Sequence, residues 1–295
     1  MKISLSKTAI ATILIVVAIA ICASLGVFLY KKTFLKEEIE NIKTEEKSSY
    51  EIIGKSVQGR NIDSYSYGSG SKNILFVGGI HGGYEWNSVL LAYNFIDFLN
   101  SNKNIIPSDI KVTIIPNANP DALYKIIPKT GILSVSDTPT STKQEQEIAR
   151  FNANNVDLNR NFDCKWKPES TWRGKKVSAG SKAFSEPEAQ AIKGYVEKNK
   201  PVAAIFWHSQ SNAVYASECN NGILPETIKI MNAYSFASGY SPIRTFDSYE
   251  ITGDAEGWLA SINIPAITVE LKTHETIEWE RNLAGFKAIL EYYSK

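Results

Sequence analysis

The chain has 295 residues, of which 43% are hydrophobic and 21% are charged, so it can fill a substantial globular core. Its formal net charge of +1 lacks the basic excess that a general nucleic-acid-binding protein normally shows, and no nucleic-acid partner is expected. Three cysteines are too few for a fold built on disulfides. Any imidazole ligands of a metal site must come from His81, His208 and His274, because the chain has no other histidine.

Residues 1–30 are set apart by their hydropathy. The run at 8–30 is almost wholly apolar, and as a helix it would be about 34 Å long, enough to cross a bilayer core of about 30 Å. We therefore expect a transmembrane anchor with a short cytoplasmic tail and an extracytoplasmic globular part. A cleaved signal peptide, leaving a secreted protein, is the alternative, because Lys2 and Lys7 give a basic start. A buried core helix is a third interpretation.

Residues 31–49 contain five Lys and five Glu and little apolar content. This composition is typical of a solvated linker or a short exposed helix. The folded domain is therefore expected to cover residues 50–295.

Within residues 50–295, short apolar runs alternate with helical patterns. Buried strands are expected at 74–77, 112–115, 203–207 and 267–271, and amphipathic helices at 85–99 and 186–197. This alternation predicts an α/β fold, with a mixed, mostly parallel central sheet and helices on both faces. In such sheets, functional sites gather beyond the ends of the strands.

Residues with metal-binding chemistry stand at two of these strand ends. His81 follows the strand at 74–77, Glu85 lies in the next helical turn, and His208 ends the strand at 203–207. Imidazole and carboxylate both bind zinc, and a catalytic zinc site needs three protein ligands and a water. Either histidine alone is more often a hydrogen-bonded or packed side chain. The three residues together predict a site for one zinc ion.

Charged residues in two other segments fit the same site. Arg160 offers a planar guanidinium that matches a carboxylate, and Arg150 adds a second positive charge, although the segment alone is typical of a polar loop. Glu270 interrupts the apolar strand ITVEL at 267–271. A buried carboxylate is costly unless it is paired, hydrogen-bonded or close to a metal. Beside zinc, Glu270 would take a proton from water.

Taken together, these residues resemble the zinc metallocarboxypeptidase family of the carboxypeptidase A/B type. The resemblance covers residues 50–293, and its landmarks occur in the family's order. They are GKSVQGRNI at 54–62, HGGYEW at 81–86, NPD at 119–121, VDLNRNF at 156–162, the His-Ser pair at 208–209, a Tyr at 249 and the strand Glu at 270. The resemblance implies that His81, Glu85 and His208 are the zinc ligands.

The resemblance also implies roles for other residues. Glu270 would be the catalytic carboxylate and Arg150 the arginine that stabilises the oxyanion. Asn159, Arg160 and Tyr249 would bind the terminal carboxylate of the substrate. The expected activity is hydrolysis of the last peptide bond of a peptide with a free C-terminal carboxylate, and the expected catalytic domain is monomeric.

Two features depart from the family pattern. The family spaces its first two ligands as HxxE, whereas the step from His81 to Glu85 is one residue longer, and the two intervening glycines would absorb it. Glu256 aligns with the specificity pocket, where an acid would favour a basic terminal residue, and Asp254 is a rival for this role. Cell-wall peptides with diamino acids and ordinary peptides are both candidate substrates.

Two other functions remain open from the sequence. An aspartoacylase-like amide deacylase shares the zinc ligands, although NPD and Tyr249 favour the peptidase. A catalytically inactive peptide-binding module is the other alternative, and the presence of Glu270 argues against it. Cys164 and Cys219 lie near the predicted site loops and would form a disulfide if the domain is extracytoplasmic.

Overall fold

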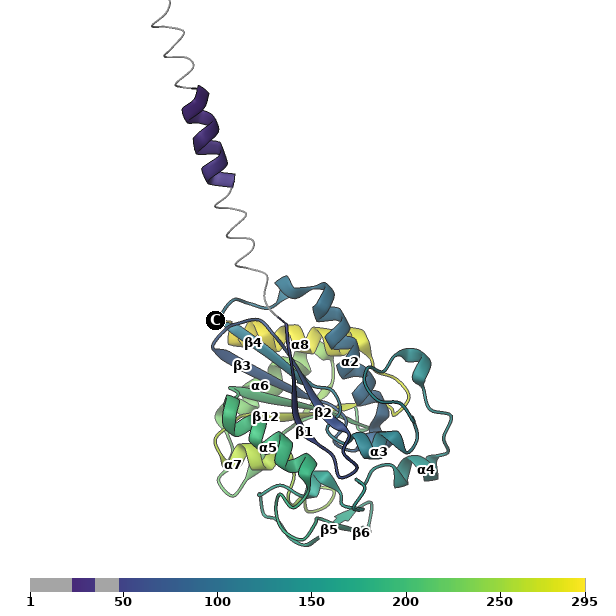
Figure 1. The fold of residues 1–295 in the computed structure, drawn as a ribbon. Coiled ribbons are helices and arrows are strands. Elements are labelled where there is room, and N and C mark those ends of the chain that lie inside the picture. The colour runs from purple at the N-terminus through teal and green to yellow at the C-terminus, as the bar shows by residue number, and fades with distance from the viewer. Residues whose placement is uncertain (1–22, 35–47, 295) are drawn as a thin grey trace, which may run out of the picture. The chain divides into compact units, whose positions relative to one another are not determined.

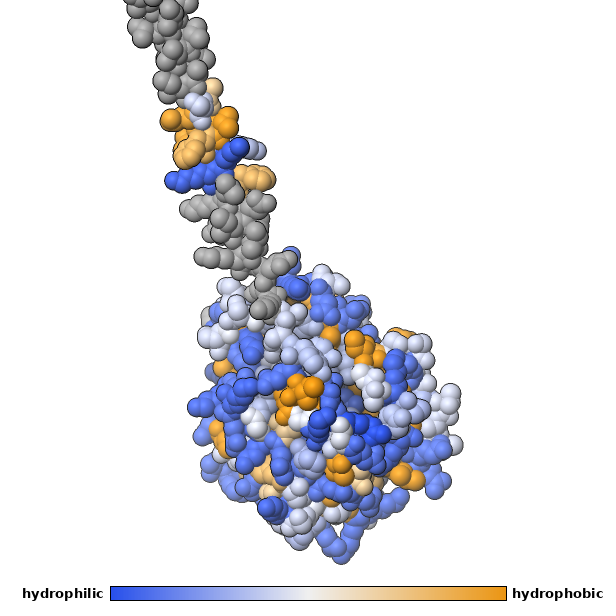
Figure 2. Space-filling model, in the orientation of Figure 1, coloured by the Kyte–Doolittle hydropathy of each residue, from blue (hydrophilic) through white to orange (hydrophobic). Residues whose placement is uncertain are grey.

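A computed structural model describes residues 23–34 and 48–294 (Figure 1). The chain divides into two units, residues 1–46 and 47–295. In the described part of the first unit, residues 23–34 are helical, and exposed hydrophobic side chains gather on this helix (Figure 2). No helix within the described ranges is long and apolar enough to cross a membrane. Most of the predicted anchor, residues 1–22, lies outside those ranges, so anchoring stays a prediction.

An eight-stranded sheet forms the centre of the second unit, in the order β1-β2-β4-β3-β7-β12-β8-β11. The strands are β1 (Ser49–Lys55), β2 (Asn61–Tyr67), β3 (Lys72–Val77), β4 (Ile110–Ile115), β7 (Ala203–Ser209), β8 (Ala213–Ala216), β11 (Ser241–Ile243) and β12 (Ala266–Leu271). Strands β4, β3, β7 and β12 run parallel, whereas β1–β2, β2–β4 and β12–β8 are antiparallel pairs. The predicted mixed, mostly parallel sheet is confirmed.

Helices cover both faces of the sheet (Figure 1). One face packs against α2 (Trp86–Ser101), α6 (Pro225–Ser238) and α8 (Trp279–Tyr293), and the other packs against α5 (Pro187–Asn199) and α7 (Ala255–Ser261). Strands β3 and β7 are buried almost throughout, because helices cover them on both sides. Their continuous apolar runs therefore identified them in the sequence.

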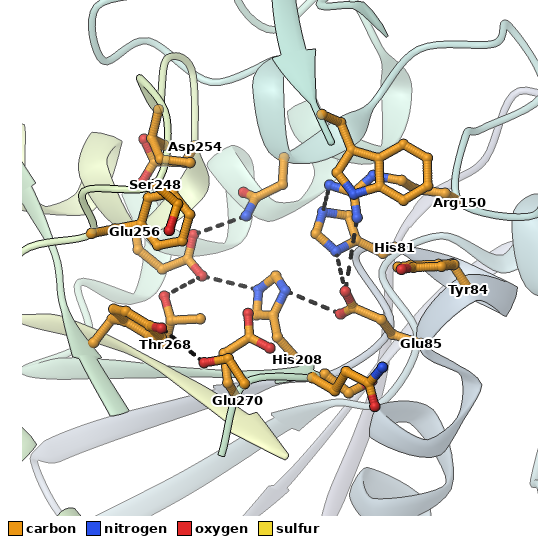
Figure 3. Close-up of a pocket in the computed structure, with 18 of the residues that line it drawn as sticks. His81, Tyr84, Glu85, Arg150, His208, Ser248, Asp254, Glu256, Thr268 and Glu270 are labelled. Carbon is orange, nitrogen blue, oxygen red and sulfur yellow. Dashed lines mark hydrogen bonds and ion pairs between the residues drawn. The ribbon is translucent and has the colours of Figure 1, made fainter. Parts of the chain in front are cut away.

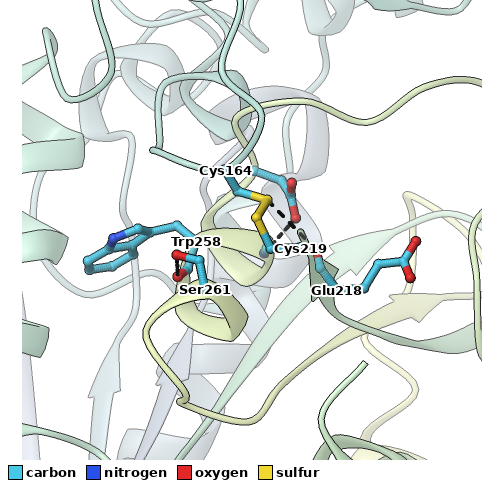
Figure 4. The surroundings of a disulfide bond; sticks show 7 residues. Cys164, Glu218, Cys219, Trp258 and Ser261 are labelled. Carbon is cyan, nitrogen blue, oxygen red and sulfur yellow. Dashed lines mark hydrogen bonds between the residues drawn. A yellow bond between two sulfur atoms is a disulfide. The ribbon is translucent and has the colours of Figure 1, made fainter. Parts of the chain in front are cut away.

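Shorter elements lie in the connections between these strands and helices. They are η1 (Gly82–Glu85), η2 (Lys103–Ile105), α3 (Pro120–Tyr124), η3 (Val135–Asp137), α4 (Lys143–Ile148), η4 (Leu158–Arg160), the hairpin of β5 (Glu169–Trp172) and β6 (Lys175–Ser178), and the pair β9 (Glu218–Cys219) and β10 (Gly222–Ile223). A disulfide between Cys164 and Cys219 ties the loop after η4 to β9 (Figure 4). The two cysteines near the predicted site loops are therefore paired.

Candidate metal centre and catalytic pocket

The three predicted metal ligands meet at one edge of the sheet (Figure 3). His81 follows β3, Glu85 ends η1, and His208 lies near the end of β7, which pairs in parallel with β3. Parallel strands present their carboxyl ends at the same edge, so the topology brings these segments together. One ligand atom of each residue lies within 4.8 Å of the others, and all three side chains are buried.

The longer step between His81 and Glu85 is absorbed by the glycine-rich turn η1. Gly82 has a φ of +49°, and a Cβ at this position would clash with the Cβ of Ala122. The turn leaves His81 Nδ1 2.8 Å from Glu85 Oε1. The unusual spacing therefore still brings the imidazole and the carboxylate to one point.

The donor set fits a zinc ion. Glu85 Oε1 faces His81 Nδ1, and Glu85 Oε2 lies 3.1 Å from His208 Nδ1. This second oxygen is buried, and within the described part of the chain its one close polar partner is His208, in a geometry that falls short of a hydrogen bond, which is costly for an ionised oxygen. A cation held between the two imidazoles and the carboxylate would remove that cost, and two His with one Glu is a known zinc-binding set.

The protonation states of His81 and Glu85 suit metal binding. Burial lowers the pKa of His81 to about 4, and the adjacent Arg150 adds to this shift, so the imidazole is neutral at pH 7. Although burial opposes ionisation of Glu85, the two histidines hold its pKa well below the ordinary value. A neutral imidazole and an ionised carboxylate are the forms that bind metals. Although burial opposes protonation of His208, Glu85 and Glu256 hold its pKa well above the ordinary value, so this imidazole releases a proton when a metal binds.

A second layer of side chains orients the ligand imidazoles. His81 Nε2 lies 2.8 Å from Arg150 Nη2 and 3.6 Å from Asp157 Oδ1. His208 Nε2 lies 3.0 Å from Glu256 Oε1, the oxygen that also accepts a hydrogen bond from Thr268. The carboxylates of Asp157 and Glu256 can accept the other ring N–H of a metal-binding imidazole, and such acceptors fix its orientation. Arg150, by contrast, can only donate to His81 Nε2.

Two of these supporting residues, Asp157 and Thr268, were not identified from the sequence. Asp157 lies inside VDLNRNF, where it accepts a hydrogen bond from Arg150 Nε at 2.9 Å. Burial opposes its ionisation, but Arg150 and Arg160 lower the pKa of Asp157 to about 2. The sequence could have indicated Asp157 by one signal, its position close to two predicted site arginines, Arg150 and Arg160.

Glu270 points into the pocket beside the metal ligands (Figure 3). Its Oε2 atom is buried and has no hydrogen-bond partner in the described ranges. Burial raises the pKa of Glu270 to about 8, and repulsion from Glu85 adds to the shift. This carboxyl group is therefore held where it can accept and return a proton.

Arg150 is buried between an acid and two aromatic rings. Its guanidinium carbon lies 4.6 Å from the ring centre of Trp172, on the β5–β6 hairpin, and 5.7 Å from that of Tyr84. Together with the bond to Asp157, these contacts fix the guanidinium next to His81. The positive charge predicted near the metal centre is present in the structure.

The predicted substrate-binding residues line one cavity of about 750 Å³ with the metal ligands. Asn159 and Arg160 lie in η4, where Asn159 departs from helical backbone angles. Arg160 Nε is buried without a hydrogen bond inside the described ranges. Tyr249 reaches the same cavity and packs against Phe246, with ring centres 4.8 Å apart.

Of the two acids proposed for specificity, Glu256 is buried and Asp254 is partly buried, and they differ in their partners. Glu256 contacts His208 and Thr268 and accepts a hydrogen bond from Asn159 Nδ2 at 3.3 Å. Asp254 caps α7 by accepting from the backbone N of Gly257, at 2.7 Å. Burial raises the pKa of Asp254 to about 6, and the charge of Glu256 adds to the shift.

Comparisons with known proteins agree with this geometry. Residues 35–286 match the sequence profile of the zinc carboxypeptidase family. The chain is 25% identical over 238 residues to gamma-D-glutamyl-L-diamino acid endopeptidase 1 of Lysinibacillus sphaericus, covering 74% of this chain and 59% of the relative. It is 27% identical over 157 residues to murein peptide amidase A of Escherichia coli K12, covering 50% and 61%. The chain thus spans about three fifths of the length of these relatives.

Solved structures share the fold. The murein-tripeptide amidase of Escherichia coli O157 superposes with a TM-score of 0.58 at 20% identity, covering 85% of this chain and 94% of that one. Bovine thrombin-activatable fibrinolysis inhibitor gives a TM-score of 0.64 at 18% identity, covering 90% and 94%. The family profile extends over most of the chain, and its residues form a His-Glu-His zinc site. The chain belongs to the zinc carboxypeptidase family, peptidase family M14.

Proposed function

We propose that this chain is a zinc peptidase that removes the C-terminal residue of peptides and prefers a terminal residue with a cationic side chain, as in diamino acids of cell-wall peptides. One observation carries the proposal. Asn159, a candidate ligand of the terminal carboxylate, donates a hydrogen bond to Glu256, which itself contacts the metal ligand His208. The proposed binding site for the substrate's terminal carboxylate therefore lies one side chain away from the metal centre.

Zinc, when bound, supplies Lewis-acid chemistry: it polarises a carbonyl and makes a water easier to deprotonate. Glu270 accepts the proton of the attacking water through its unpartnered Oε2 and delivers it to the leaving amine. Arg150 donates hydrogen bonds to the carbonyl oxygen as negative charge develops there. Asp157 and Trp172 hold the guanidinium in place for this task.

The free end of the substrate determines which bond is cut. The guanidinium of Arg160 receives the terminal carboxylate, and its unpartnered buried Nε leaves it one hydrogen bond to gain. Asn159 and Tyr249 complete this binding from the same cavity. Because this carboxylate-binding site adjoins the metal centre, only the last peptide bond of the substrate reaches the reacting groups.

Two neighbouring acids in the catalytic pocket support the proposed preference for a substrate whose terminal residue has a cationic side chain. Asp254 and Glu256 lie close enough for the charge of one to raise the pKa of the other. A substrate ammonium group between them would relieve this repulsion. The names of two relatives, which refer to murein peptides and to L-diamino acids, support diamino-acid peptides as substrates of this chain.

We also propose that the catalytic domain works outside the cytoplasm, attached through residues 1–30. The disulfide between Cys164 and Cys219 supports this location, because such bonds persist mainly in oxidising compartments.

Peptides that differ only at their last residue test the activity. The zinc-loaded full chain is expected to release a terminal Lys or diaminopimelate faster than a terminal Ala or Phe, and to leave C-terminally amidated peptides intact. Equal cleavage of free and amidated peptides would show that the terminal carboxylate is not recognised. Hydrolysis of acylated amino acids without any cleavage of peptides would favour the deacylase instead.

A further inference from the structure

A second cavity, of about 550 Å³, lies apart from the catalytic pocket, and within the described ranges the two share no lining residue. It is formed by strands β1 and β2, α2, the chain around Pro116 and α3, and residues 129–131. Its volume falls in the range of small-molecule sites. Because β3 and β4 are parallel, the chain leaving β4 at Pro116 stands at the same sheet edge as His81 after β3.

Aromatic side chains form one wall of this cavity. Tyr50 on the edge strand β1 is the direct cross-strand partner of Tyr65 on β2, and their ring centres are 5.3 Å apart. Tyr50 is 54% exposed, so the part of its ring that does not contact Tyr65 is open to a ligand. Tyr93, on α2, lines the same cavity and is only 4% exposed.

One hydroxyl in this wall has no protein partner among the described residues. Among the described residues, nothing hydrogen-bonds to the hydroxyl of Tyr93, although this side chain is more than nine-tenths buried and lines the cavity. Burial and the nearby Tyr65 and Asp63 raise the pKa of Tyr93, so the hydroxyl remains a neutral donor. A largely buried phenol usually has a hydrogen-bond partner, and here the partner is a molecule in the cavity, either water or a ligand that displaces it.

The charged groups of the cavity, by contrast, already have partners. Arg60 forms an ion pair with Asp121 at 2.7 Å, and Lys129 forms one with Asp137 at 2.7 Å. Asp63 accepts a hydrogen bond from the hydroxyl of Tyr50 at 2.9 Å. The groups that remain available are therefore aromatic faces and neutral hydroxyls, which suit an uncharged ligand rather than an ion.

We propose that this cavity binds a neutral saccharide. The C–H face of a sugar ring packs on Tyr50 and Tyr65, and a sugar hydroxyl or amide oxygen accepts a hydrogen bond from Tyr93. The bound sugar lies at the same sheet edge as the metal centre, so a substrate carrying both sugar and peptide can reach both sites.

The test is calorimetric titration of the zinc-loaded full chain with a β-1,4-linked tetramer of N-acetylglucosamine, a neutral saccharide. We expect a dissociation constant of roughly 0.1–1 mM, as befits a shallow site. Tyr50→Ala should weaken binding at least about tenfold, and Tyr93→Phe, which keeps the ring, should weaken it by about three- to tenfold. Tyr292→Phe is the matched control, because its hydroxyl binds Glu226 outside the cavity.

Three results would overturn this proposal. They are no heat of binding at roughly 10 mM saccharide, unchanged affinity in both cavity variants, and competition between the saccharide and a peptide substrate for the catalytic pocket. Peptide hydrolysis by Tyr50→Ala should equal that of the unchanged protein. Because the titration does not depend on catalysis, its failure leaves the proposed peptidase activity untouched, and failure of the peptidase activity leaves the titration interpretable.

Discussion

Glu270 on β12 lies directly opposite His208 on β7 in the parallel register of these strands. Their neighbours Val269 and Trp207 belong to the core beneath α2, α6 and α8, so alternation turns Glu270 and His208 to the other face of the sheet. That face is open at the carboxyl ends of the strands, where the pocket begins. Two ordinary strands thus place a proton acceptor beside a metal ligand.

Replacement of Glu270 by Gln tests this relationship. We expect kcat to fall by roughly 10²- to 10⁴-fold, because the amide cannot accept the proton of water. The zinc content, measured by elemental analysis, should remain one per chain, since the three ligands are unchanged. A variant that keeps zinc and the full kcat would exclude Glu270 as the proton acceptor.

Trp172 is expected to act as a positioning residue for Arg150. Trp172→Ala removes the ring against the guanidinium and should lower kcat about tenfold, with little change in KM. Trp172→Phe retains an aromatic face and should recover most of the rate. A rise in KM at constant kcat would instead show that this ring binds substrate.

Asp254→Asn should make stability less dependent on pH. The pKa of this partly buried acid in the folded protein, about 6, lies above its ordinary value of 3.8, so the folded state holds the proton more tightly than the unfolded state. The stability contributed by this proton is present below about pH 4 and is lost as the pH rises through about 6. Asn keeps the cap of α7 and carries no charge.

The free energy of unfolding of Asp254→Asn should therefore exceed that of the unchanged protein by about 1–3 kcal/mol at pH 7.5, and match it near pH 4. Denaturant titration at the two pH values measures this. Asp247→Asn, at an exposed position, is the control and should show no pH-dependent difference. Equal stability of Asp254→Asn and the unchanged protein at both pH values would show that the fold does not raise the pKa of Asp254.

Reduction of the Cys164–Cys219 disulfide should destabilise the domain. The bond joins cysteines 55 residues apart, and its loss is expected to cost about 2–4 kcal/mol of unfolding free energy. Mass spectrometry after alkylation, with and without reductant, reports the state of both thiols. Alkylation of both cysteines in the unreduced native protein would show that they are not paired.

The parts of the fold that the sequence predicted are those with a strong local signal. Strands β3, β4, β7 and β12 lie between helices on both faces, and therefore appear as continuous apolar runs. The edge strand β1 is largely exposed and has no such pattern, so it was not predicted. The metal ligands were identified because they follow predicted parallel strands.

Contacts between distant segments could not be predicted in the same way. The hairpin of β5 and β6 carries Trp172 onto Arg150, and no spacing rule links residues 22 positions apart across an irregular loop. Glu256 contacts His208 only because α7 packs beside β7 and β12.

Zinc content and peptide hydrolysis, measured on the same sample of full-length protein, test the zinc site most directly. A peptide ending in Lys is assayed before chelation, after chelation and dialysis, and during stepwise return of zinc. We predict that hydrolysis disappears with the metal and is fully restored at one zinc per chain, with no restoration in His208→Ala. Undiminished hydrolysis by the zinc-free protein would contradict a peptidase activity that depends on zinc at this site.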